Sequence, residues 1–140
     1  MRLIECRQLV ASDTGAYGTI QATLGHIIND ERYYIWLAHG KLTAWQEIQT
    51  NAMSVAELRL LAEENGRQLI DLAAIADILP SIVKAVEGDE PWFMPIGSVI
   101  PVGIILTQAI VHAVEHRTNV TTILAKLGVK HSDLSAWNLL

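Results

Sequence analysis

The sequence predicts an all-α protein, an up-down helical bundle in a single domain over residues 1–140. Three long segments repeat apolar residues at the three- and four-residue spacing of one helix face. Residues that start and stop helices flank these segments. A chain of 140 residues is long enough to bury its own core, and no repeat or linker divides it.

The first long helix is expected over residues 17–39, and Gly40 ends it. A short apolar segment, residues 3–10, precedes this helix and ends near a polar turn. The stretch after the helix, residues 41–53, has a mixed composition. It is expected to form a loop with a short helix around residues 44–49.

The second long helix begins at a capping box. Ser54 and Glu57 form the Ser-x-x-Glu pattern, in which each side chain caps the backbone N–H of the other residue. Apolar residues continue at helical spacing as far as Pro80, which is expected to end the helix.

The last long helix is expected over residues 101–127, with Gly128 just beyond its C-terminus. The pattern before it, over residues 81–99, predicts a small extended or hairpin excursion. After it, residues 133–137 are expected to form a short closing helix.

Composition and charge exclude several classes of protein. With 15 acidic residues against 10 Lys and Arg, and with no basic cluster, the chain is not expected to bind nucleic acid. The single cysteine, Cys6, excludes a disulfide framework and a Cys-rich zinc module. It fits a reducing compartment, so we expect a cytoplasmic protein.

The mean hydropathy of +0.29 is high for a small domain. The longest uncharged run, Pro91 to Val114, has enough residues to cross a bilayer. However, prolines and glycines interrupt its first half, and no basic cluster flanks it. We therefore expect no membrane span, and assign the apolar surplus to a bundle core and to an association surface.

Two histidines mark the last helix as a candidate metal site. His112 and His116 are four residues apart, which places them one turn apart and roughly 40° around the helix axis. Two imidazoles side by side are what one metal ion takes from a single helix. The same face is apolar, so the pair is expected to point inward; a partly exposed pair at the end of the bundle is the alternative.

A third ligand has to come from another segment, and the chain offers His26, His39 and His131. His39 lies at a helix end and His131 in a polar turn, as surface histidines do. His26 lies in the middle of a long helix, on a small and polar stripe. That stripe also fits a solvated helix face, and the need for a third nitrogen is what favours His26 as a ligand.

Residues 112–116 also fit the His-x-x-Glu-His pattern of inverted zinc proteases, in which Glu115 would be the general base. Those enzymes need a further acidic ligand downstream, and Asp133 is the only acid after His116. A protease is therefore not expected.

Three segments resemble the DinB-like family, metal-binding four-helix bundles first named for damage-inducible bacterial proteins. Residues 23–31 look like its LxHxxxxE segment, and residues 108–120 resemble its HxxxHRxQI signature, with Asn119 in place of the glutamine. Residues 124–137 resemble its usual ending, so the likeness covers most of residues 19–137.

The resemblance implies that His26, His112 and His116 hold a divalent metal ion, with positions left open for water or substrate. Three neutral imidazoles suit Zn²⁺ best, and they also accept Ni²⁺ or Fe²⁺. Characterised members of the family include thiol S-transferases and a thiol-dependent isomerase. The resemblance therefore implies metal-assisted transfer of a small-molecule thiol to an electrophile.

Asp30, Tyr33 and Asn119 are candidates for contacts with the ligands, and Asn119 or a carboxylate would fix an imidazole tautomer. No residue is identified as catalytic. Two alternative functions stand beside the transferase: a non-catalytic metal- or ligand-binding stress protein, and a structural dimer with incidental histidines.

The family normally has a full helix ahead of the first ligand, whereas this chain allows only residues 2–11. Either the start of the chain is truncated or misassigned, or the first helix is a short stub. A stub would leave an apolar strip between the neighbouring helices, and we expect a homodimer whose interface covers it. Sedimentation equilibrium should give twice the mass of the 15.4 kDa chain. A monodisperse monomer would contradict this expectation.

Overall fold

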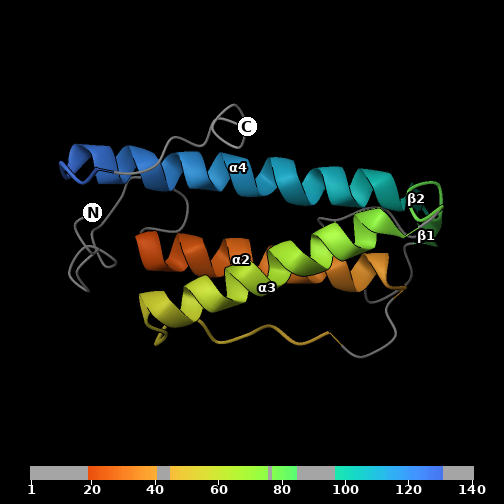
Figure 1. The fold of residues 1–140 in the computed structure, drawn as a ribbon, viewed down its shortest axis with the longest axis horizontal. Helices are drawn as coiled ribbons and strands as arrows, with labels where there is room; N and C mark the ends of the chain where they lie inside the picture. Colours follow the sequence, from red (N-terminus) through yellow and green to blue (C-terminus); the bar gives the residue numbers. More distant parts are fainter. Residues whose placement is uncertain (1–18, 41–44, 76, 85–96, 131–140) are drawn as a thin grey trace.

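The computed structural model describes residues 19–40, 45–75, 77–84 and 97–130 (Figure 1). These residues form three long helices: α2 (Ile20–Ala38), α3 (Val55–Ala74) and α4 (Val102–Lys126). A small antiparallel hairpin, β1 (Ile82–Lys84) and β2 (Val99–Pro101), precedes α4. The expected all-α class is confirmed for this part of the chain. The expected segments at residues 3–10 and 133–137 lie outside the described residues, and so does the shortened first helix.

Helix α2 is the central element, with α3 and α4 both packed against it (Figure 1). α4 runs antiparallel to α2, whereas α3 runs in the same direction as α2. The expected up-down alternation is therefore wrong for α2 and α3. The cause is the connection between them, which returns along the length of α2 before α3 begins.

Two side chains of α2 hold the returning connection. The side chain of Asn29 accepts a hydrogen bond from the Ile48 N–H at 2.8 Å and donates one to the Ile48 carbonyl at 3.0 Å. Further along, Gln21 donates to the carbonyls of Asn51 and Met53 at 2.8 and 2.9 Å. Because Asn29 occupies both backbone groups of Ile48, the short helix expected around residues 44–49 does not form over residues 45–49.

The helix boundaries follow the expected signals at most ends. The capping box of Ser54 and Glu57 is formed in both directions. Gly128 follows the C-cap of α4 in a left-handed conformation, with φ of 70°. Helix α3, however, ends at Ala74 rather than near Pro80. Instead, the carbonyls of Ser81 and Leu79 accept hydrogen bonds from the N–H groups of Val102 and Gly103 at the start of α4, which would otherwise lack partners.

The hairpin confirms the excursion expected before the last helix, with residues 85–96 outside the described part. Val83 pairs with Ile100, and both side chains are buried. Their neighbours along each strand are exposed, so the hairpin covers the core with one face.

Two separate apolar clusters hold α2 against α4. One lies at the hairpin end and joins the second half of α2 to the first half of α4, together with Leu72 of α3. The other, at the opposite end, packs Ile20 against Val120, Ile123 and Leu124. Polar side chains meet between these clusters. None of the described helices is long and apolar enough to cross a membrane.

We predict that Gly25→Ala destabilises the protein by about 1–3 kcal/mol through overpacking. A Cβ at Gly25 would clash with the hydroxyl of Thr50 and come within 3.0 Å of its Cβ, in the returning connection. Gly66→Ala in α3 is the matched control, because a Cβ there meets nothing within 4 Å. It should stabilise by about 0.5–1 kcal/mol through helix propensity alone. Denaturant unfolding measures both, and equal effects would contradict the prediction.

Candidate metal centre

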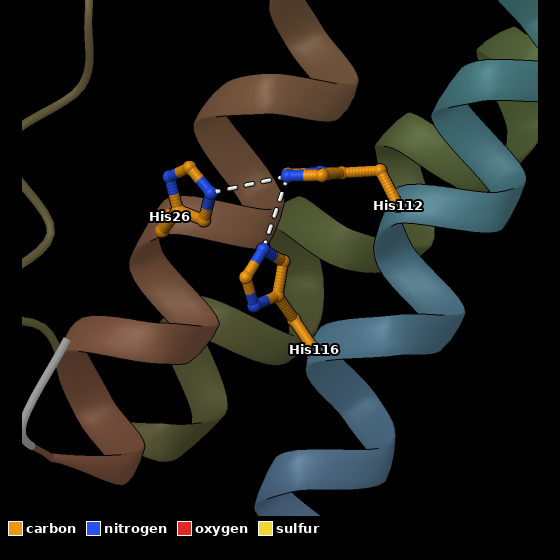
Figure 2. A group of neighbouring side chains, drawn as sticks. All are labelled: His26, His112 and His116. Atoms are coloured by element: carbon orange, nitrogen blue, oxygen red, sulfur yellow. Dashed lines mark hydrogen bonds between the residues drawn. The ribbon is translucent and has the colours of Figure 1, made fainter. Parts of the chain in front are cut away.

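The three predicted ligands come together between α2 and α4 (Figure 2). His26 extends from α2, and His112 and His116 extend from successive turns of α4. The Nε2 atom of His112 lies 3.4 Å from Nε2 of His26 and 3.0 Å from Nε2 of His116. One nitrogen from each ring lies within 4.8 Å of the other two. Among the described residues, this is the only such group able to hold a metal ion.

The nitrogen separations fit a small divalent ion. Zn–N bonds of about 2.0–2.1 Å at tetrahedral angles place two ligand nitrogens roughly 3.3 Å apart. The separations of 3.4 and 3.0 Å at His112 lie on either side of this value. Two of the three separations are therefore close to those around a single ion, and all three nitrogens lie within 4.8 Å of one another.

Asp30 lies beside two of these rings, at the Nδ1 edge and not the Nε2 edge. Its carboxylate lies 3.4 Å from Nδ1 of His26 and 3.5 Å from Nδ1 of His112. An ionised carboxylate only accepts hydrogen bonds, so Asp30 favours the tautomers that carry hydrogen on Nδ1. In these tautomers the Nε2 atoms of His26 and His112, which lie 3.4 Å apart, are both acceptors, and a metal ion bound by both would satisfy them.

Burial keeps His26 and His112 in the neutral form that binds metal. It lowers the pKa of His26 to about 4, with further lowering by His112 and His116. The pKa of His112 is also lowered, first by burial and then by His116, against an opposing effect of Glu115. Burial and the nearby Glu47 raise the pKa of Asp30 to about 6, so this carboxyl group is mostly ionised at pH 7.

The structure separates the three residues expected around the ligands. Asp30 touches two ligand rings, as described above. Tyr33 is buried in an aromatic cluster, stacked on Trp36 at 5.5 Å and edge-on to Trp45 at 5.2 Å between ring centroids. Asn119 is exposed on α4. The neighbouring tyrosine, Tyr34, is the one whose ring lies 6.3 Å from that of His112.

The remaining histidines lie away from this group or outside the described residues. His39 is exposed at the C-terminal end of α2, as expected of a surface histidine. His131 lies outside the described residues. Glu115, the general base of the protease pattern, is exposed on α4.

Sequence reasoning missed a polar network beside the triad. Glu31 is 4% exposed and accepts hydrogen bonds from Arg117 of α4 at 2.7 Å and from Asn65 of α3 at 3.2 Å. Asn65 also donates to the Ile28 carbonyl at 3.0 Å. Glu31 and Arg117 both belong to the segments that resemble the DinB-like motifs, and that was the signal available for them.

Comparison of the chain with protein-family models, with curated proteins and with solved structures finds no significant match. The DinB-like resemblance therefore stays a prediction.

We predict that His26 of the metal-free protein titrates near pH 4, whereas in denaturant it should titrate near its ordinary value of 6.5. Because its pKa is lower in the folded state, the unfolded chain takes up this proton first as the pH falls. The stability that neutral His26 contributes is therefore present above pH 6.5 and lost as the pH falls toward 4. NMR titration of the imidazole resonances measures the pKa directly, and a folded-state value at or above 6.5 would contradict the prediction.

Proposed function

We propose that this chain binds one divalent metal ion through His26, His112 and His116, with Zn²⁺ as the best-suited ion. The observation that carries the proposal is the convergence of three Nε2 atoms while Asp30 lies against Nδ1 of two of the rings. Carboxylates in this position orient metal-ligating histidines and raise their basicity. Ni²⁺ and Fe²⁺ are the other ions that an all-imidazole set accepts.

The ligand number favours a reactive centre over a structural one. Structural zinc sites use four protein ligands, whereas catalytic sites use three and leave a position for water or substrate. The side chains of His26 and His112 are 21% and 19% exposed, so the group is not sealed from solvent. A divalent ion bound there would lower the pKa of a coordinated water or thiol toward ~7.

We further propose that the reaction is transfer of a low-molecular-weight thiol to an electrophile. In such a transfer the thiol proton is lost to solvent, a sulfur–carbon bond forms, and the leaving group departs with its electron pair. The DinB-like resemblance and the three-ligand set support this proposal. Within it, Asp30 holds two ligand rings in their binding tautomers, and Tyr34 covers one side of His112.

Cobalt titration of the untagged protein tests the metal proposal. Co²⁺ should bind at one equivalent per chain. Its visible absorption should be that of a site with a low coordination number, which absorbs more strongly than six-coordinate Co²⁺. His26→Ala and His112→Ala should each abolish stoichiometric binding, because two imidazoles remain. His39→Ala removes an exposed histidine outside the group and should bind as the wild type does. Absence of stoichiometric metal in the wild type would contradict the proposal.

Adding a small thiol to the cobalt-loaded protein tests the transfer proposal. Coordination of a thiolate should produce a sulfur-to-cobalt charge-transfer band and shift the visible bands. If the metal binds but no thiol alters the spectrum, the transferase proposal fails. The non-catalytic metal-binding alternative would then stand.

A further inference from the structure

The network of Glu31, Arg117 and Asn65 joins all three long helices, and we call it the polar clamp. Glu31 belongs to α2, Arg117 to α4 and Asn65 to α3. Both carboxylate oxygens of Glu31 are used, one by Arg117 and the other by Asn65. Burial raises the pKa of Glu31, while Asn65 and Arg117 oppose that rise. The two donors thus offset part of the cost of burying this carboxyl group.

The polar clamp lies beside the metal-binding group in sequence on both helices. Glu31 directly follows Asp30, whose carboxylate contacts two ligand rings. Arg117 directly follows His116. The contact between Glu31 and Arg117 therefore fixes α2 and α4 one residue away from the contacts that assemble the three histidines.

Apolar packing alone leaves the position of α4 along α2 less well defined. The two apolar clusters hold the helices at their ends, and hydrophobic contacts have no directional preference. A metal site tolerates displacements of only about 0.5 Å. An arginine–carboxylate contact of 2.7 Å has a defined direction and length, and it lies between the clusters where the ligands meet.

The stability contribution of such a pair does not explain its presence. Removing two charges from water offsets much of their attraction, so a partly buried ion pair adds little net stability, although in some proteins such pairs define one arrangement of the fold. Exposed pairs of the same length, such as Arg59–Glu63 at 2.7 Å, define no contact between helices because both residues lie on α3.

We infer that Glu31 and Arg117 are positioning residues for the metal centre: they set α4 on α2 so that His112 and His116 meet His26. This inference rests on the proposed metal-binding function. It assigns to the polar clamp a role in metal affinity and coordination geometry, and not only in joining helices.

Glu31→Gln tests the inference, since it keeps the size of the side chain and removes its charge. The glutamine amide presents one NH₂ group to Arg117 or Asn65, and both of these are donors. Co²⁺ affinity should fall, by up to about the 10- to 100-fold that is lost when a residue in direct contact with a metal ligand is replaced. The visible spectrum at saturation should change as well. Glu63→Gln, which removes the exposed pair on α3, is the matched control and should bind cobalt as the wild type does.

Arg117→Lys provides a second variant, because the Arg117 side chain is 43% exposed and its replacement keeps the charge. It should fold, and its cobalt affinity should lie between those of the wild type and Glu31→Gln. Thermal unfolding of the metal-free variants separates binding from stability. Wild-type affinity and spectrum in both variants would overturn the inference and leave the polar clamp as a joint between helices. Failure of the wild type to bind cobalt would instead overturn the metal-binding proposal on which the inference rests.

Discussion

The central helix carries three polar residues in a row, and each of them has to find a partner. Asn29, Asp30 and Glu31 lie near the middle of α2, which has other parts of the chain packed along several of its sides. Successive residues of a helix point about 100° apart, so the three side chains face three different neighbours. Asn29 binds the returning connection, Asp30 meets the histidines, and Glu31 binds α3 and α4.

Local patterns predicted the features that depend on residues close together in sequence. The spacing of His112 and His116, the capping box at Ser54 and the glycine after α4 are of this kind. Contacts between residues far apart in sequence could not be predicted from such patterns. The Asn29 side chain makes two hydrogen bonds with the Ile48 backbone and directs the connection back along α2. From the sequence alone, this asparagine fits a solvated helix surface equally well. For the same reason, nothing in the sequence indicated that α2 and α3 run parallel.

The group of three histidines shows the same division. The pair on α4 follows from spacing, whereas His26 was favoured by the need for a third nitrogen and by the DinB-like resemblance. Asp30 was expected near the ligands and lies against two of them. Tyr33 was also expected near the ligands, but its side chain lies in an aromatic cluster with Trp36 and Trp45. The tyrosine near His112 is the next residue, Tyr34. A one-residue difference on a helix turns a side chain by about 100°. Because α2 is buried on several sides, apolar spacing does not show which of those sides faces the ligands.

The contact between His26 and His112 joins residues that are 86 positions apart. Closing so long a loop costs entropy before any contact compensates for it, and such contacts slow folding. While α4 is still inside the ribosome, the folding chain lacks two of the three imidazoles. Ion binding at the proposed metal centre would therefore come late, after α2 and α4 have docked. The bound ion would then stabilise the completed fold relative to its partly folded precursors.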